Sequence, residues 1–351
     1  MVDVQATQEP PLVRAARKER VERTPVWFMR QAGRVLPEYR QIRTSHSLLD
    51  ICRQADLAAT VTLQPVERFD VDAAIIFADI ITPLLGVGLK VDIVEKVGPV
   101  LDEPIRSRAD LERLRCLEPE QDLPAMLEAL RLVRNALPDE KALIGFAGAP
   151  FTLATYLIEG GPSKNYTTTK SLMYSQPDFW HELMGRLSDM IVVYLLAQAS
   201  AGAQVLQLFD SWVGWLSQRD YCEYVFPYTA RIIKAAQTNG VPVIHFATGA
   251  GALNGAIMQA PPDVVGLDWR VPLDESWAAL GDVAVQGNLD PAVLLAPADV
   301  VRDQTRDVMR RAAGRPGHIF NLGHGFLPQT PLDSIFQVIE CVREWNGSVG
   351  S

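Results

Sequence analysis

The strongest constraint on the fold is a regular alternation of short apolar segments with longer helical patterns. Apolar runs of this length are typical of strands that are buried on both faces. Strands that alternate with helices form a parallel sheet. Seven strands are therefore predicted, at residues 73–77, 142–146, 205–209, 241–246, 264–267, 283–286 and 318–321.

The predicted sheet fits two α/β architectures. An open doubly wound sheet is disfavoured, because no strand is followed by a GxGxxG or P-loop signature. A (β/α)8 TIM-type barrel binds its ligands in the loops after the strands. Polar residues and a glycine cluster there: Asp79, Gly148, Asp210, Ser211, Asp268, Asn288 and His324. We therefore expect a TIM-type barrel, although the sequence does not locate its eighth strand.

No linker or internal repeat divides the chain, so we expect a single catalytic barrel domain over residues 17–351. Residues 1–16 are expected to form an N-terminal extension, a mobile tail. Residues 87–100 alternate and contain glycines, which predicts a small hairpin insertion outside the main repeat. An apolar helical pattern over residues 51–69 contains Pro65, which is expected to kink or split the helix.

The charge and cysteine content limit the partners and the compartment. A formal net charge of −9 argues against a nucleic-acid partner and against a basic surface that faces a membrane. No apolar run reaches the roughly 18 residues of a transmembrane helix, and the polar start is not a secretory signal. Widely spaced cysteines favour reduced thiols in a cytoplasmic protein. No metal-ligand spacing is present, so no metal is expected.

A basic stretch over residues 27–40 carries three arginines and one acid. Arg30 and Arg34 are four residues apart with a glycine between them, and Pro25 and Pro37 bracket the run. This pattern favours a fixed loop over a long helix. Gathered guanidinium groups suit an anionic ligand, because each can hold a carboxylate or phosphate with two parallel hydrogen bonds. The alternative is a solvated basic face.

Four further side chains are candidates for chemistry. Asp79 follows an apolar strand, so its carboxylate is either a turn cap or an acceptor for cationic or N–H-bearing ligand atoms. His324 lies between two glycines, which allow a ligand to approach the backbone closely. Ser211 lacks a GxSxG context and is better interpreted as a hydrogen-bond donor to a ligand. Tyr156 is by default a core or hinge aromatic residue.

From about residue 25 to residue 345 the chain resembles the uroporphyrinogen decarboxylase family. The resemblance rests on M-R-Q-A-G-R followed by L-P-E-Y-R, on G-F-A-G-A-P-F-T-L, and on N-L-G-H-G. I-I-F with Asp79 and the segment G-N-L-D-P support it. The family motif often has a histidine after the serine, where this chain has Trp212.

The resemblance implies a (β/α)8 barrel, usually a homodimer, that works without cofactor or metal. It implies removal of the carboxyl group from each of the four acetate side chains of uroporphyrinogen III, which gives coproporphyrinogen III and carbon dioxide in heme biosynthesis. The family's site residues fall on Arg30, Gln31, Arg34, Asp79, Tyr156, Ser211 and His324, with Phe209 lining the cleft.

The chemistry of such a substrate assigns roles to these residues. A protonated pyrrole ring accepts the electrons of the departing carboxylate, and Asp79 would stabilise that cation while Arg30 and Arg34 bind acidic side chains. The proton donor stays open between an arginine and His324, whose ordinary pKa is about 6.5. Two alternatives are a methyltransferase of the same broad barrel superfamily, which needs a zinc-thiolate site, and a tetrapyrrole carrier that binds without turnover.

Overall fold

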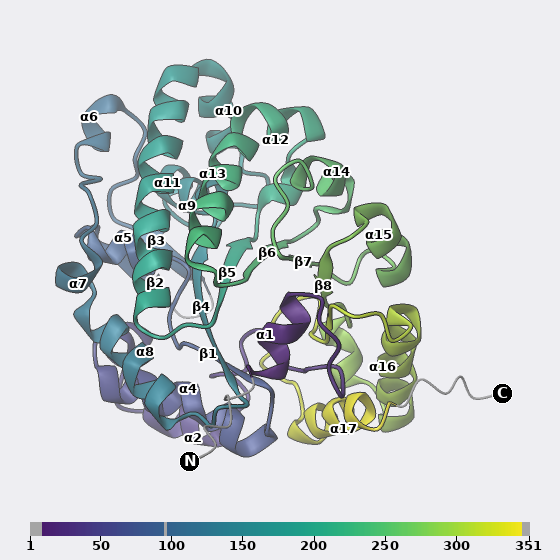
Figure 1. Ribbon diagram of the computed structural model, residues 1–351. Helices are drawn as coiled ribbons and strands as arrows, with labels where there is room; N and C mark the ends of the chain where they lie inside the picture. Colours follow the sequence, from purple (N-terminus) through teal and green to yellow (C-terminus); the bar gives the residue numbers. More distant parts are fainter. Residues whose placement is uncertain (1–8, 95–96, 346–351) are drawn as a thin grey trace, which may run out of the picture.

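The computed structural model describes residues 9–94 and 97–345, and its centre is a curled sheet of seven strands (Figure 1). Every neighbouring pair is parallel, in the order β1-β4-β5-β6-β7-β8-β9. The strands are β1 (Ala73–Ile75), β4 (Ala142–Gly148), β5 (Val205–Asp210), β6 (Val243–Ala247), β7 (Val264–Gly266), β8 (Ala284–Gln286) and β9 (His318–Ile319). Each lies within a predicted apolar segment or extends it by one or two residues, so the predicted parallel sheet is confirmed.

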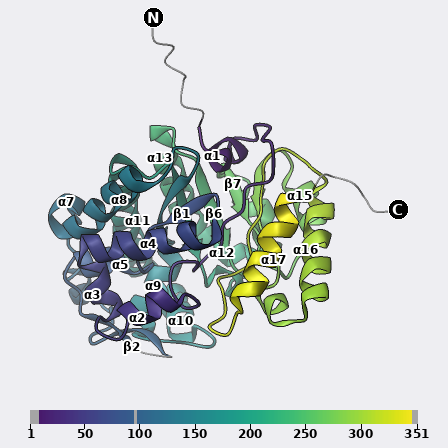
Figure 2. The same ribbon diagram turned by 90° about the horizontal axis from the view of Figure 1, so that it is seen from below.

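Helices surround the sheet and follow its strands in order (Figure 1). The outer helices are α4 (Ala55–Phe69), α8 (Pro124–Ala136), α11 (Pro177–Ser200), α13 (Phe226–Ala236), α14 (Asn254–Ile257), α15 (Leu273–Leu280), α16 (Ala298–Ala312) and α17 (Leu332–Arg343). The last helix, α17, lies beside α16 and also contacts α4, so the first and last helices of the layer meet (Figure 2). None of the described helices is long and apolar enough to cross a bilayer.

Shorter helices fill the connections. They are α2 (Pro37–Ile42), α3 (Leu48–Cys52), α5 (Thr82–Gly86), α6 (Arg108–Leu111), α7 (Pro119–Asp122), α9 (Pro150–Glu159), α10 (Thr167–Ser175) and α12 (Gln218–Tyr224), with 3-10 turns at Val213–Trp215, Gln237–Asn239, Gly251–Leu253 and Pro291–Leu295. The predicted insertion is an antiparallel hairpin of β2 (Val91–Val94) and β3 (Gly98–Leu101), which confirms that prediction.

Pro65 does not split the predicted helix over residues 51–69, so that part of the prediction was wrong. Pro65 is buried inside α4, which continues to Phe69, and the chain instead breaks between α3 and α4. A separate capping box begins α3, in which Ser47 and Asp50 exchange side-chain to backbone hydrogen bonds. Burial of the proline ring compensates for the hydrogen bond that it cannot donate.

The prediction of a mobile tail was wrong for its second half. Residues Pro11–Ala16 form α1, which buries Leu12 and Val13 and contacts β4, β8 and β9. Arg17 then donates a hydrogen bond to the carbonyl oxygen of Gly240. The helix was missed because it has only six residues, and its stability comes from packing on the sheet. Residues 1–8 lie outside the described part of the chain.

An extended N-terminal segment lies between the two outer strands of the sheet. Val26 forms a parallel bridge with Phe320, whose N–H donates to the carbonyl oxygen of Pro25 at 2.9 Å. On its other side, the carbonyl oxygen of Val26 accepts the N–H of Asp72, which directly precedes β1, at 2.8 Å. The buried Asp72 carboxylate also accepts the N–H of Val26 at 2.7 Å and both terminal nitrogens of Arg23.

Candidate active site

After the segment between β9 and β1, the basic stretch over residues 27–40 forms a loop, and several buried side chains hold this loop in place. Arg30 has a φ of 62°, in the left-handed region that residues other than glycine seldom adopt, so the conformation of the loop fixes the direction in which its side chain leaves the backbone. The N–H of Met29 donates to Oδ1 of Asn321 at 3.2 Å, which ties the loop to the segment after β9. The predicted loop is confirmed up to Pro37, where α2 begins.

Gln31 supports this loop from the interior. Its side chain is fully buried, its Nε2 donates to the carbonyl oxygen of Ala73 at 2.7 Å, and its Oε1 accepts the N–H of Phe28 at 3.0 Å. Both polar ends of the side chain are therefore occupied by backbone groups. The buried Gln31 side chain therefore ties the loop that carries Arg30 to β1.

The glycine loop after β9 packs between Arg30 and Trp269. A Cβ atom added at Gly325 would lie 2.4 Å from Cδ of Arg30, and one at Gly323 would lie 2.2 Å from the backbone nitrogen of Trp269. His324 lies between these two contacts, with its ring 6.3 Å from the ring of Trp269. Only glycine permits this packing, so the sequence pattern G-H-G has a steric reason.

Asp79 caps a turn, and its carboxylate also lies close enough to Arg30 for their charges to interact. Arg30, Arg34, Asp79, Tyr156 and His324 are called the charge cluster below. Its Oδ1 accepts the N–H of Ile81 at 3.1 Å, and its carbonyl oxygen accepts the hydroxyl of Thr82 at 2.7 Å. Burial raises the pKa of the Asp79 carboxyl, and the N–H of Ile81 and the guanidinium of Arg30 act in the opposite direction. The two interpretations of Asp79 from the sequence are therefore compatible.

Electrostatic coupling connects the candidate residues to one another. Burial lowers the pKa of Arg30, the neighbouring charge of Arg34 lowers it further, and Asp79 and Tyr156 raise it. Burial and then the Asp79 charge raise the pKa of Tyr156 to about 12. Burial, followed by the positive charges of Arg30 and other arginines, lowers the pKa of His324 to about 4. Five predicted residues from distant parts of the chain thus influence one another at the carboxyl-terminal ends of the strands.

Aromatic side chains adjoin this charge cluster. The ring of Phe209 packs edge-on against Phe146 at 5.4 Å and against Phe246 at 6.0 Å, and Phe246 lies 6.5 Å from His324. Ser211 directly follows β5 and is half-buried. The ring of the next residue, Trp212, lies 6.2 Å from the ring of Tyr156 and 5.4 Å from the ring of Tyr166, so these three aromatic side chains form a wall.

Sequence reasoning missed one arginine at this site. Arg270 lies two residues after Asp268, and its Nη1 donates to Oδ2 of that buried carboxylate at 2.6 Å. Its guanidinium lies over the ring of Trp269, 4.0 Å from the ring centre. The sequence contained a signal for Arg270, because this arginine follows a predicted strand closely, and ligands of barrel proteins bind in the loops after the strands. The sequence had indicated only Asp268.

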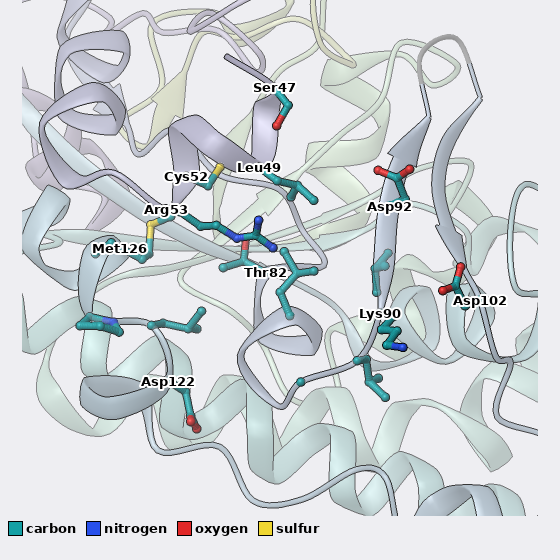
Figure 3. Close-up of a pocket in the computed structure, with 17 residues that line it drawn as sticks. Ser47, Leu49, Cys52, Arg53, Thr82, Lys90, Asp92, Asp102, Asp122 and Met126 are labelled. Carbon is teal, nitrogen blue, oxygen red and sulfur yellow. The ribbon is translucent and has the colours of Figure 1, made fainter. Parts of the chain in front are cut away.

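A cavity of about 740 Å³ opens elsewhere, between α3, α5, α8 and the β2–β3 hairpin (Figure 3). Its charged lining is mixed and consists of Arg53, Lys90, Asp92, Asp102 and Asp122. Burial raises the pKa of the Cys52 thiol in this cavity to about 12, so the thiol stays protonated at neutral pH. None of the eight residues predicted from the sequence lines it.

No group of three or more His, Cys, Asp or Glu side chains within residues 9–94 and 97–345 is placed to hold a metal ion. The four cysteines, Cys52, Cys116, Cys222 and Cys341, are free thiols. The site therefore consists of arginine, carboxylate, tyrosine, histidine and aromatic groups at one edge of a parallel sheet. These features are typical of an α/β enzyme built on a curled parallel sheet, and gathered arginines suit an anionic ligand.

Comparison with known proteins identifies the family. The family model described as Uroporphyrinogen decarboxylase (URO-D) matches residues 7–345. A uroporphyrinogen decarboxylase from Carboxydothermus hydrogenoformans is 49% identical over 333 residues, which cover 95% of each chain. One from Sorangium cellulosum is 52% identical over 332 residues, or 94% of this chain and 95% of that protein. The chain belongs to the uroporphyrinogen decarboxylase family.

A more distant likeness concerns the fold alone. A methyltransferase from Methanosarcina mazei has a TM-score of 0.76 at 15% identity, covering 95% of this chain and 97% of the other. It supports the architecture of a parallel sheet surrounded by helices.

Proposed function

We propose that the protein is a uroporphyrinogen decarboxylase, which removes the four acetate carboxyl groups of uroporphyrinogen III and releases coproporphyrinogen III and carbon dioxide. The observation that carries this proposal is the placement of a half-buried carboxylate, Asp79, near Arg30, which also lies near Arg34, in a chain of this family. A substrate with eight carboxylates and four pyrrole N–H groups needs both kinds of partner.

Each decarboxylation begins with a proton added to a carbon of the pyrrole ring, which makes the ring cationic. The bond between the acetate methylene and its carboxyl group then breaks, carbon dioxide leaves, and the electron pair neutralises the ring. A second proton on the methylene carbon gives a methyl group, and loss of the first proton restores the pyrrole. One proton is consumed per carbon dioxide, and no oxidation or reduction takes place.

Asp79 has the central role in this sequence. Its carboxylate accepts the pyrrole N–H groups and stabilises the ring cation, and a preorganised charge of this kind contributes several kcal/mol. Arg30 and Arg34 bind the acidic side chains that surround the reacting ring. Tyr156 and Ser211 contribute hydroxyl groups, and Phe209 packs against the macrocycle.

Arg30 and His324 are the two groups that can supply the proton. In the protein without substrate, burial and the nearby arginines lower the pKa of His324 to about 4, so its imidazole is neutral at pH 7. Burial and the charge of Arg34 also lower the pKa of Arg30. Substrate carboxylates raise the pKa of both groups, so His324 gains its proton only once the substrate is bound.

Three finer points complete the proposal. Residues 25–27 act as the eighth strand, because they bond to Phe320 on one side and to Asp72 on the other, and this closes a (β/α)8 barrel. The described residues fold as one catalytic domain. We place the protein in the cytoplasm as a homodimer, without cofactor or metal, as the family resemblance implies.

An anaerobic product assay tests the proposal. The purified protein is incubated with uroporphyrinogen III and no added metal, and the products are oxidised and separated by carboxyl number. Stepwise hepta-, hexa- and pentacarboxylate intermediates followed by the tetracarboxylate are expected. Absence of all these products would refute the proposed decarboxylase activity. If the protein binds substrate in a single-turnover experiment but forms no product, the alternative of a tetrapyrrole carrier is favoured. Asp79→Asn should lower kcat at least about 100-fold if the carboxylate stabilises the cation.

A further inference from the structure

The glycine loop that carries His324 has an arginine on each side. On one side, Gly325 packs against the side-chain carbons of Arg30, where an added Cβ would lie 2.4 Å from Cδ. On the other side, Gly323 packs against the backbone of Trp269, whose neighbour is Arg270. The two arginines are far apart in the sequence, and the loop lies between the Arg30 side chain and the backbone that precedes Arg270.

Arg270 is held in a fixed orientation. Its Nη1 donates to Oδ2 of Asp268 at 2.6 Å, and its guanidinium carbon lies over the Trp269 ring, 4.0 Å from the ring centre. Asp268 is itself fixed, because its two carboxylate oxygens accept the N–H of Gly249 at 2.6 Å and the N–H of Arg270 at 3.0 Å. A guanidinium held in this way loses little conformational entropy when it binds an anion.

The Arg270 guanidinium is open to solvent on the side that faces away from Asp268. The Asp268 side chain is 3% exposed and the Arg270 side chain 50% exposed, so the carboxylate is sealed in the protein while the guanidinium reaches solvent. Asp268 occupies Nη1, and a planar guanidinium offers further donors at Nη2 and Nε. This arrangement suits a second carboxylate that comes from solvent.

We propose that Arg270 is a substrate-binding residue that holds a propionate carboxylate of the tetrapyrrole across the His324 loop from Arg30. The proposal rests on the proposed function. Propionates are the carboxylates that persist from the octacarboxylate to the tetracarboxylate, so an anchor on them serves every step.

A position away from the reacting centre supports this assignment. Both Arg30 and Arg270 act electrostatically on His324, but only Arg30 also acts on Asp79 and Tyr156. With its side chain 50% exposed, Arg270 lies toward the rim of the site, where it influences binding of the macrocycle and leaves the chemical step to Asp79. Loss of Arg270 should raise KM and leave kcat nearly unchanged.

The test compares Arg270→Gln with Arg315→Gln. Arg315 is a matched control, because its guanidinium also lies over a tryptophan ring, that of Trp277 at 5.5 Å, but it precedes β9 and so lies at the opposite end of the strands. Dissociation constants are measured by quenching of tryptophan fluorescence with uroporphyrin and coproporphyrin, which bind without turnover. KM and kcat are measured anaerobically with uroporphyrinogen III.

Arg270→Gln should raise KM and both dissociation constants about 10- to 100-fold and change kcat less than about threefold. Arg315→Gln should leave all four values within about twofold. Unchanged porphyrin affinity in Arg270→Gln would overturn the proposal, and an effect on uroporphyrin alone would overturn the assignment to propionate. If Arg270→Gln fails to fold, Arg270→Lys, which keeps the charge but not the fork, should still raise the dissociation constants. A wild-type protein that binds porphyrin without turnover would refute the proposed function and leave the binding comparison valid.

Discussion

A single methyl group at Gly325 tests whether the position of Arg30 controls the reaction. The Cβ of an alanine there would lie 2.4 Å from Cδ, 2.6 Å from Cγ and 3.0 Å from Cβ of Arg30. Carbon atoms in contact lie about 3.5–4.0 Å apart, so the Arg30 stem must move by roughly 1 Å or more. These atoms belong to the base of the side chain, so a rotation of the guanidinium alone does not relieve the overlap.

The size of the effect follows from this displacement. A misplacement of about 1 Å in a positioning group costs on the order of 100-fold in rate. A factor of 100 corresponds to about 2.7 kcal/mol of lost transition-state stabilisation. We therefore expect Gly325→Ala to lower kcat/KM for uroporphyrinogen about 100-fold, while the midpoint of thermal unfolding changes by only a few degrees.

The assay needs a glycine substitution without a clash as its control. Gly185 lies inside α11, and an added Cβ there would meet no atom within 4 Å. Gly185→Ala should therefore keep full activity and raise stability by about 0.5–1 kcal/mol, because alanine is the better helix former. Normal kcat/KM in a folded Gly325→Ala variant would refute the idea that the glycine loop positions Arg30.

Three other predictions concern the scaffold and the aromatic wall. Asp72→Asn should lower the free energy of unfolding by about 3 kcal/mol in urea titrations, because it removes a buried carboxylate from its ion pair with Arg23, whereas Asp282→Asn, at a carboxylate that is 93% exposed, should change it by less than about 0.5 kcal/mol. Burial lowers the pKa of His318 to about 4, so the unfolded chain binds more protons below pH 6.5. Stability should fall as the pH drops from 6.5 toward 4, and His318→Gln should weaken that dependence. Trp212 packs edge-on against Tyr156 with the rings 6.2 Å apart and opposes the rise that burial causes in the pKa of its hydroxyl, so Trp212→Phe should lower kcat/KM about tenfold but have no further effect in a Tyr156→Phe background.

The sequence pattern located the strands because burial on both faces leaves a continuous apolar run. It did not locate the segment over residues 25–27, which pairs through one bridge and a few backbone hydrogen bonds and carries no strand-length pattern. The six-residue α1 was missed for a related reason, since only tertiary contacts stabilise it. Local patterns report local burial, and short segments held by distant partners leave little trace in them.

The site shows the same limit at the level of side chains. Motifs identified Arg30, Asp79 and His324, and the structure places them in one charge cluster. The same motif contains Gln31, but its hydrogen bonds to Phe28 and Ala73 make it a support for the loop. A motif therefore marks residues that a site requires without separating those that face the ligand from those that hold the loop.

The arginines that suit the site to a polyanion also determine which groups can move protons there. A chain with a net charge of −9 gathers Arg30, Arg34 and Arg270 around one imidazole, and after burial their charges lower its pKa to about 4. A bound substrate carboxylate would offset that positive charge, raise the pKa of His324 again, and stabilise the protonated form of Arg30. Departure of carbon dioxide removes one such carboxylate at each step. The protonation state of the site is therefore coupled to the progress of the reaction, and the pH dependence of the first decarboxylation should differ from that of the fourth.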